Sequence, residues 1–189
     1  MAANPELPYM DVAEYLAFER HSPVKHEYVD GHVYAMSGGT RAHSEIAVNI
    51  VAALRAHLRG GPCRVYNSDA RVQVSARRHL YPDVSVSCDE RDHADDGDAV
   101  AHPALVIEVL SQSTEAYDRG DKFDLYRSKE SLREYVLVSA TRMGVNVYRR
   151  EDGGWKLFPA APGDEVALDS IGFRCPIDAF YEDVVLPEE

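Results

Sequence analysis

Two acidic residues of this 189-residue chain stand where buried strands are expected. Glu108 lies inside the apolar run 104–110, and Asp83 follows Pro82 at the start of the strand-like segment 81–87. A carboxylate in a buried strand costs several kcal/mol unless it is paired, protonated or bound to a metal. Two acids on neighbouring strands could hold a hard divalent cation through oxygen ligands. We therefore take Asp83 and Glu108 as candidate metal ligands, with Mg²⁺ or Mn²⁺ as the cofactor.

Each of these acids also has a plain structural interpretation. Glu108 could be a strand-end glutamate that reaches solvent, because it lies toward the C-terminal end of its apolar run. Asp83 could be an ordinary turn aspartate before a strand. Neither residue is informative alone, and the hypothesis depends on the pair.

Lys122 is the third candidate. It lies fourteen residues after Glu108, inside a helix expected at 114–128. From that helix a lysine can fold back over the end of the preceding strand. A lysine beside a metal-bound water can position the water and stabilise charge on an attacked phosphate. The alternative is an exposed helix lysine beside Asp118 and Asp121.

The sequence lacks the motifs that other enzyme classes require. The sequence contains no phosphate-binding glycine loop and no dinucleotide-binding glycine fingerprint, so nucleotide-cofactor readings have no support. Ser111 and Ser113 lie near Glu108 but in no nucleophile elbow. The eight histidines form no zinc-protease pattern.

The elements that must position these residues alternate between strands and helices. Strands are expected at 25–29, 32–36, 65–66, 71–75, 81–87, 104–110, 134–138, 144–148, 155–158 and 166–168. Helices are expected from Asp11 to about residue 21, at 40–59 and at 114–128, with a last helical turn at 177–181. Asp30-Gly31 and the segment 152–154 predict hairpin turns. The order strand, helix, strand over 104–138 predicts a βαβ-like unit. We expect one domain over 1–189, of the α/β class with a mixed sheet.

Charge is distributed unevenly along the chain. Twenty Lys and Arg against 32 Asp and Glu give a net charge of −12. The segment 55–79 carries six arginines and a single acid, whereas 89–98 carries six acids and a single arginine. This asymmetry permits a local anion-binding face on an acidic protein. The alternative is two solvated faces of opposite sign.

The composition and the cysteines give an expectation for the cellular location. No apolar run approaches the ~18 residues of a transmembrane helix, and residues 1–8 lack the basic and apolar regions of a signal peptide. The cysteines, Cys63, Cys88 and Cys175, are few, odd in number and without metal-type spacing. We expect a cytoplasmic protein with no membrane partner.

The segments around these candidates resemble the PD-(D/E)XK nuclease superfamily and, more narrowly, the bacterial Uma2 family of putative restriction endonucleases. The matching segments are 27–31 (EYVDG), 81–83 (YPD), 103–114 (PALVIEVLSQST), 117–126 (YDRGDKFDLY) and 134–138 (EYVLV). The resemblance covers residues 10 to 180 approximately. It implies a restriction-endonuclease-like core, a mixed β-sheet flanked by helices with extra β-hairpins, a Mg²⁺-type site and hydrolysis of phosphodiester bonds.

The resemblance also assigns residues. Asp83 and Glu108 match the metal-binding acids, and Glu27 matches a glutamate that the family carries on the hairpin. His43 fits a histidine near the start of the long helix; its alternative is a plain surface histidine. The superfamily spacing would put the lysine at position 110, which is a leucine here. The resemblance implies that the lysine has moved to Lys122.

Two functions of different classes follow. The first is a metal-dependent DNA endonuclease in which Lys122 orients the hydroxide and Arg71, Arg77 and Arg78 contact phosphates. The second is a non-catalytic binding or regulatory module that keeps the nuclease fold, which the net charge and the lysine position favour. A homodimer is expected for the first, because a two-fold pair readily cuts both strands of a duplex.

Overall fold

The computed structural model describes residues 9–36, 38–94 and 97–187. Residues 1–8, read above for a targeting segment, and Asp95 and Asp96 of the acidic stretch lie outside the described residues. The helices are α1 (Val12–Glu19), α2 (Arg41–His57), α3 (Glu115–Arg119) and α4 (Asp121–Arg127), with 3₁₀ turns η1 (Glu90–Asp92), η2 (Asp169–Ile171) and η3 (Ile177–Phe180). The strands are β1 (His26–Val29), β2 (His32–Ala35), β3 (Arg64–Asn67), β4 (Arg71–Ser75), β5 (Arg78–Leu80), β6 (Val84–Ser87), β7 (Ala99–Val100), β8 (Pro103–Leu110), β9 (Glu134–Ser139), β10 (Val145–Glu151), β11 (Gly154–Ala160), β12 (Glu165–Leu168) and β13 (Phe173–Pro176).

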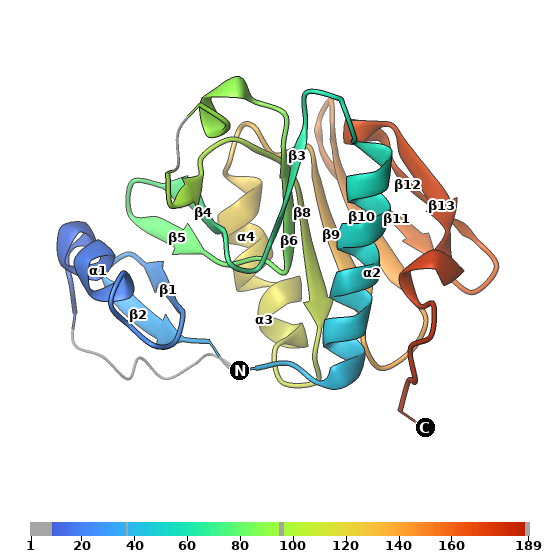
Figure 1. Cartoon of the computed structure of the whole chain (residues 1–189), viewed down its shortest axis with the longest axis horizontal. Coiled ribbons are helices and arrows are strands. Elements are labelled where there is room, and N and C mark those ends of the chain that lie inside the picture. Colours follow the sequence, from blue (N-terminus) through green and yellow to red (C-terminus); the bar gives the residue numbers. More distant parts are fainter. Residues whose placement is uncertain (1–8, 37, 95–96, 188–189) are drawn as a thin grey trace.

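The strands form a mixed six-stranded sheet, a second five-stranded sheet and a ribbon. The six-stranded sheet has the order β11-β10-β9-β8-β6-β3, the five-stranded sheet β2-β1-β5-β4-β7, and β12 pairs with β13. β8 and β9 run parallel, whereas β6 and β8 run antiparallel. α2 covers one face of the six-stranded sheet, and α3 and α4 lie on the other (Figure 1). The expected fold class and the parallel βαβ unit over 104–138 are confirmed.

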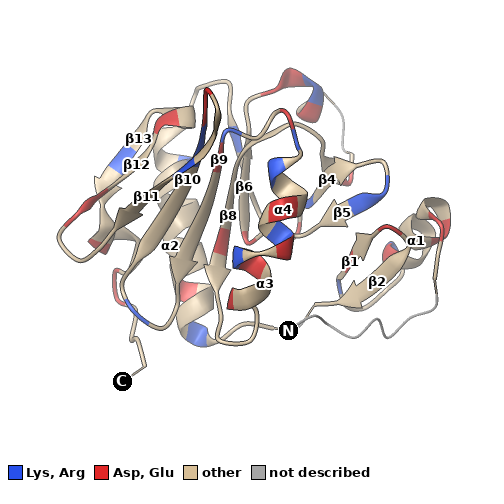
Figure 2. Cartoon of the chain, turned by 180° about the vertical axis from the view of Figure 1, so that it is seen from behind, with Lys and Arg blue, Asp and Glu red and all other residues tan. Residues whose placement is uncertain are grey.

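The central strand β8 is buried on both faces, and its alternation decides where Glu108 points. Leu105, Ile107 and Val109 pack in the core beneath α2. Val106 and Leu110 pack on the opposite face, with the α4 side chain Tyr126. Side chains along a strand alternate between faces, so Glu108 belongs to the face that α3 and α4 cover. Figure 2 shows this face from behind, with the acidic segment of β8 beside the two helices.

The sequence signals that predicted the start of α1 and the β1–β2 turn are confirmed. Asp11 caps α1 through a reciprocal capping box with Glu14. The hairpin turn between β1 and β2 has positive φ at Asp30 (51°) and Gly31 (103°), as a type I′ turn requires. This hairpin fixes the register of β1 and thereby the position of Glu27.

One helix and three strands differ from expectation. The helix expected at 114–128 is divided into α3 and α4 at Gly120, whose φ of −113° and ψ of −99° are not helical. Glycine is the weakest helix former after proline, so the break falls where helix propensity is lowest. β5, β7 and β13 were not predicted, because strands of two to four residues show little alternation. The break leaves Lys122 in the first turn of α4.

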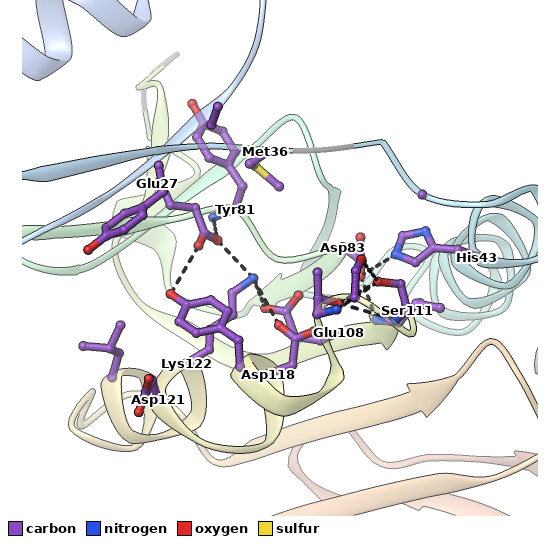
Figure 3. A pocket seen from close by; sticks show the side chains of 18 of the residues that line it. Glu27, Met36, His43, Tyr81, Asp83, Glu108, Ser111, Asp118, Asp121 and Lys122 are labelled. Carbon is purple, nitrogen blue, oxygen red and sulfur yellow. Dashed lines mark hydrogen bonds and ion pairs between the residues drawn. The ribbon is translucent and has the colours of Figure 1, made fainter. Parts of the chain in front are cut away.

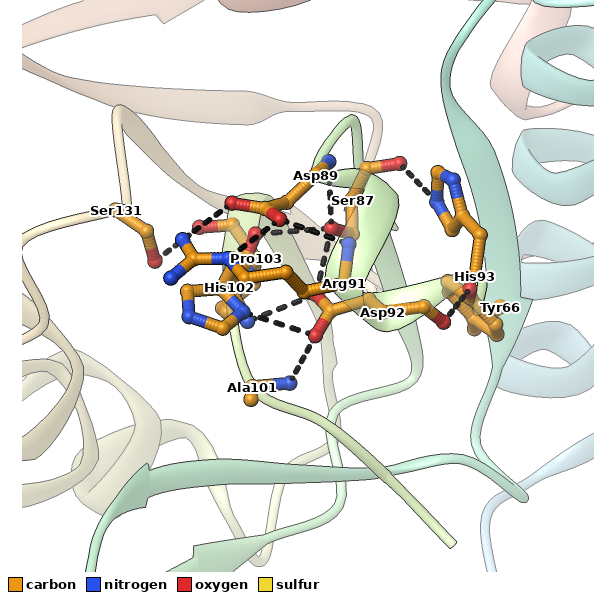
Figure 4. Close-up of polar contacts among 10 residues, drawn as sticks. All are labelled: Tyr66, Ser87, Asp89, Arg91, Asp92, His93, Ala101, His102, Pro103 and Ser131. Atoms are coloured by element: carbon orange, nitrogen blue, oxygen red, sulfur yellow. Dashed lines mark hydrogen bonds and ion pairs between the residues drawn. The ribbon is translucent and has the colours of Figure 1, made fainter. Parts of the chain in front are cut away.

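The acidic segment was expected to be a solvated loop, and at Asp92 that expectation is wrong. The buried Asp92 carboxylate accepts hydrogen bonds from the Ser87 hydroxyl at 2.6 Å and from the His102 amide at 2.8 Å (Figure 4). His102 Nδ1 lies 3.0 Å from its other oxygen. Burial raises the pKa of Asp92, but the hydrogen bonds from Ser87 and His102 outweigh burial, so the pKa lies below its usual range. Asp92 therefore ties the end of β6 to the start of β8.

Cys63 and Cys88 form a disulfide that cysteine spacing did not predict. Arg64 of β3 pairs with Ser87 of β6 in an antiparallel register, which sets the adjacent cysteines opposite each other. A disulfide persists in oxidising compartments, so this pair does not support the expectation of a cytoplasmic location. Among the described residues, no helix combines the length and apolarity needed to cross a bilayer.

Candidate active site

A cavity of about 770 Å³ lies between the β1–β2 hairpin, the start of α2, the ends of β6 and β8, and α3 with α4. The five side chains expected to be catalytic all line it: Glu27, His43, Asp83, Glu108 and Lys122 (Figure 3). Further acids in its wall are Asp118, Asp121 and Asp124. The cavity therefore contains six carboxylates, one ammonium group and one imidazole. The structure brings the predicted residues together, while their catalytic roles stay predictions.

Glu108 and Lys122 form a buried ion pair at the floor of the cavity. The Lys122 Nζ atom lies 2.9 Å from Glu108 Oε1, and both side chains are almost fully buried. Glu108 is only 3% exposed, so the interpretation as a strand-end residue that reaches solvent is wrong. Lys122 is 5% exposed, so it is not an exposed helix lysine. Its place in the first turn of α4 lets the side chain reach back over β8.

The same ammonium group also holds Glu27. Lys122 Nζ lies 3.0 Å from Glu27 Oε1. That oxygen accepts the Tyr81 backbone N–H at 3.2 Å, and the other oxygen accepts the Tyr117 hydroxyl at 3.4 Å. Asp118 lies further off, at 3.8 Å from the ammonium. Glu27 is thus fixed from β1, β5–β6 and α3 at once, and it positions Lys122.

The pKa values of this cluster show an excess of negative charge. Burial raises the pKa of Glu108, the Lys122 ammonium opposes this, and the neighbouring acids Asp118, Asp83 and Glu27 add to it. Burial also raises the pKa of Asp118. Burial alone would lower the pKa of Lys122, but Glu108 and Glu27 hold it well above its usual value. One ammonium serves three carboxylates, so the site favours an additional cation.

Asp83 lies beside Glu108 on the neighbouring strand. β6 and β8 pair Val84 with Ile107, so residues 83 and 108 follow as the next cross-strand neighbours. One Asp83 oxygen accepts the Val109 backbone N–H at 2.7 Å. The same oxygen lies 3.2 Å from His43 Nε2.

His43 lies in the first turn of α2, where the Thr40 side chain caps the helix by accepting the His43 backbone N–H at 3.2 Å. Its side chain is 19% exposed and faces Asp83, so the plain surface histidine is not what the structure shows. The hydrogen bond to Asp83 raises the pKa of His43 more than burial lowers it. The imidazole can therefore hold a proton at Nε2 next to the Asp83 carboxylate.

The carboxylate oxygens of Asp83 and Glu108 are suitable ligands for a hard divalent cation. Glu108 Oε1 is buried, and its partner among the described residues is the Lys122 ammonium at 2.9 Å. Mg²⁺ commonly binds one or two carboxylates and completes its shell with water and substrate phosphate oxygens. The described residues contain no cluster of three or more metal-ligating side chains. Two acids in a solvent-accessible cavity fit a weak site of this kind.

Three residues of the site were missed by sequence reasoning. Asp118 precedes Lys122 by four positions, and that spacing on a helix was a usable signal. Tyr117 contacts Glu27 from α3, which no local pattern indicates. Tyr81 acts through its backbone N–H, which a sequence does not reveal.

The arginines expected to contact DNA lie away from this cluster and differ in access. Arg71 is 6% exposed, and its guanidinium lies 5.9 Å from the centre of the Tyr15 ring. Arg71 presents almost no surface to a ligand, so we no longer expect it to contact DNA phosphates. Arg78 pairs with Asp30 at 2.9 Å, and Arg77 donates to the Asp30 carbonyl at 3.3 Å. Arg77 and Arg78 stay predictions.

Known proteins share the sequence pattern and the fold of this chain. The sequence pattern of the Uma2 family, described as "Putative restriction endonuclease", matches residues 12–178. The "Uncharacterized protein slr1290" of Synechocystis sp. is 42% identical over 185 residues, which cover 96% of this chain and 97% of that protein. The "Uncharacterized protein sll1609" of the same organism is 30% identical over 151 residues, covering 78% and 85%.

A solved structure has the same fold. It is the crystal structure of a "putative nuclease belonging to DUF820" from Anabaena variabilis. The TM-score is 0.78 at 17% identity, and the match covers 93% of this chain and 99% of the other. At this identity the likeness establishes the fold, and the chemistry has to be argued from the cavity.

Proposed function

Since the chain belongs to the Uma2 family of putative restriction endonucleases, we propose that it hydrolyses phosphodiester bonds of DNA with the help of Mg²⁺ or Mn²⁺. The observation that carries the proposal is the buried cluster of Glu108, Lys122 and Glu27 beside Asp83 in one cavity. An ammonium group held by two carboxylates next to a cross-strand pair of acids is a costly arrangement for a fold. It is explained if the cluster performs chemistry.

Asp83 and Glu108 would hold the divalent cation. When bound, such a cation acts as a Lewis acid on a phosphate oxygen and lowers the pKa of a coordinated water. Lys122 directs its ammonium group into the cavity, where it can orient the attacking water and stabilise negative charge on the phosphate. Glu27 fixes that ammonium group by its 3.0 Å contact. His43 holds a proton at Nε2 and keeps the Asp83 carboxylate oriented.

The electrostatics of the cavity support the presence of a cation. Six carboxylates against one ammonium group would repel a phosphodiester. The added charge of a divalent cation offsets this repulsion where the phosphate must lie. The cavity is also lined by apolar or aromatic side chains, which are Val29, Tyr34, Ala35, Met36 and Leu125. These side chains can accept the sugar and base of the nucleotide.

The proposal also includes the contacts with DNA, the oligomeric state and the cellular location. Arg77 and Arg78 are exposed or half-buried near the β1–β2 hairpin and would contact phosphates of the substrate. A homodimer would allow both strands of a duplex to be cut. We place the protein in the cytoplasm, where DNA is available and where the Cys63–Cys88 pair would be open to reduction.

The second function considered is a non-catalytic binding or regulatory module with the same fold. One argument for it was the leucine at position 110 in place of the motif lysine. Lys122 reaches Glu108 at 2.9 Å from α4, so an ammonium group is present despite this substitution. The net charge of −12 remains the observation that favours the module.

Incubation with supercoiled plasmid separates the two functions. We expect the wild-type protein to nick or linearise the plasmid in Mg²⁺ or Mn²⁺ and to do nothing in EDTA. Asp83→Asn and Glu108→Gln should abolish cleavage, whereas Glu130→Gln, which removes one exposed acid elsewhere, should not. A folded wild-type protein that binds DNA but leaves it intact with either metal would support the non-catalytic module.

A further inference from the structure

Three arginines gather at the opposite end of α2 from the cavity. Arg55, Arg59 and Arg64 line a surface hollow of about 280 Å³ between the end of α2 and the edge strand β3. The other lining residues are Leu58, Gly60, Cys63 and Val65. All three arginines are exposed, and the lining contains no acid. We call these three residues the arginine triplet.

Among the described residues, the triplet gathers three exposed arginines without acidic partners in one hollow, whereas Arg133 and Arg142 are exposed arginines without such a partner outside it. Arg20, Arg91 and Arg174 each pair with a carboxylate, at 3.2, 2.6 and 3.1 Å. Within the described part of the chain, no carboxylate lies at ion-pair distance from the triplet. On a protein with a net charge of −12, three uncompensated cations in one hollow indicate an anionic ligand.

α2 connects the hollow to the catalytic cavity. His43 lies in the first turn of α2, and Arg55 follows twelve residues later in the same helix. At 1.5 Å per residue this spans about 18 Å along the axis. Successive phosphates of one DNA strand are spaced by about 3.4 Å along the duplex, so this is about five base pairs. Figure 1 shows α2 running between these two ends of the molecule.

Between the two ends, α2 carries one charged side chain, Glu45, which lies 3.8 Å from Arg41. The exposed residues between His43 and Arg55 are Ser44, Val48 and Ala52. A duplex laid along the face of Ser44, Val48 and Ala52, beside the paired Glu45, would meet small or apolar side chains and then the triplet. Guanidinium groups suit this contact, because they bind phosphate oxygens through paired N–H donors.

We propose that Arg55, Arg59 and Arg64 form a second DNA contact, which holds backbone phosphates of a duplex about five base pairs from the bond at the cavity. The inference rests on the proposed function for its substrate. Free inorganic phosphate shares the same chemistry, so the test has to distinguish the two sources. The antiparallel pairing of β3 with β6, which sets Arg64 opposite Ser87, would keep Arg64 in place beside the end of α2.

The test measures duplex binding without metal, so that no cleavage occurs. The variant carries Arg55→Gln, Arg59→Gln and Arg64→Gln. The matched control carries Arg20→Gln, Arg91→Gln and Arg174→Gln, with the same loss of charge at exposed sites. Affinity is measured by fluorescence anisotropy against salt concentration and against duplex length from about 4 to 20 base pairs.

We expect the triplet variant to lower the slope of log affinity against log salt by about three, one for each lost phosphate contact. The control should change it by less than about one. Without metal the cavity carboxylates repel the duplex, so the triplet should be the main contact. The wild-type protein should therefore bind duplexes of every length more tightly than the variant does. Equal slopes for the variant and the control would overturn the proposal.

Inorganic phosphate provides the second arm. If ³¹P line broadening by the wild-type protein disappears in the triplet variant while the salt slopes for duplex stay equal, the hollow binds free phosphate and the DNA contact is wrong. Cleavage is not part of this readout. A protein that shows the slope difference but never cuts DNA contradicts the proposed hydrolysis and leaves the triplet contact supported.

Discussion

Glu108→Gln distinguishes a glutamate kept for chemistry from one kept for the fold. In the metal-free protein, Lys122 contacts Glu108 at 2.9 Å and Glu27 at 3.0 Å. Removing the Glu108 charge leaves the ammonium paired with Glu27. It also removes a carboxylate whose pKa is raised by burial and by three neighbouring acids. The loss and the gain oppose each other, so we expect the free energy of unfolding at pH 7 to change by less than about 1 kcal/mol.

Lys122→Met is the contrasting perturbation. It leaves Glu27, Glu108 and Asp118 buried with no cation among them. Breaking a buried pair by removing one partner costs about 3–5 kcal/mol, and we expect a loss of that size. The Glu108→Gln and Lys122→Met changes together should be less destabilising than Lys122→Met alone, because one uncompensated charge is gone.

Urea unfolding in EDTA, followed by circular dichroism, measures these differences. A second series in 10 mM Mg²⁺ tests the metal. If the dissociation constant is about 1 mM, the wild-type protein gains about 1.4 kcal/mol, and the Glu108→Gln variant gains nothing. A loss of about 3 kcal/mol or more for Glu108→Gln in EDTA would refute the reasoning, because Glu108 would then be a structural ion-pair partner.

Three further results are expected. Calorimetry should show millimolar Mn²⁺ binding that Asp83→Asn and Glu108→Gln abolish; unchanged binding would place the metal elsewhere. Burial, with a contribution from Arg71, lowers the pKa of His79 to about 4. As pH falls from about 6.5 to 4, only the unfolded state therefore gains a proton at this histidine. This lowers the free energy of unfolding by up to about 3 kcal/mol. His79→Phe should flatten the unfolding free energy in this range, and an unchanged slope would exclude His79 as its cause. Asp92, with its lowered pKa, contributes fully above about pH 4 and loses that contribution as pH falls through its folded pKa. Asp92→Asn should cost about 1–3 kcal/mol at pH 7 and less in acid, and an equal cost at both would contradict this.

The acids of the site were predictable because they violate a local rule. Glu108 interrupts an apolar run, and Asp83 opens the next core strand. The direction of Glu108 follows from the two-residue period of a strand once α3 and α4 are known to cover its face. Local pattern therefore identified the acids, and their neighbours on the sheet explain why they face the helices.

The remaining features depend on contacts between distant segments. Glu27 reaches Lys122 only because the β1–β2 hairpin lies over α4 at the cavity. The division of the helix at Gly120 has a propensity signal but needed the structure to show that the chain turns there. The Cys63–Cys88 pair follows from the register of β3 and β6, which no cysteine spacing encodes.

The surface formed by the basic segment also depends on contacts between distant segments. The basic segment 55–79 was read as one face, but the fold divides it. Arg71 is buried under α1, Arg77 and Arg78 lie near Asp30, and the arginine triplet lies at the end of α2. Counting charges along a sequence cannot distinguish a buried arginine from one that can bind a phosphate.

The central claim is that Asp83 and Glu108 support hydrolysis of DNA in this cavity. Its most direct test is the single-turnover rate of cleavage of an end-labelled duplex in 10 mM Mg²⁺ by the wild-type protein and by Glu108→Gln, with the fold of both checked beforehand. We predict a measurable wild-type rate that vanishes in EDTA and falls by about 10³-fold or more in the variant. Equal rates for the two proteins, or cleavage that persists in EDTA, would contradict the account.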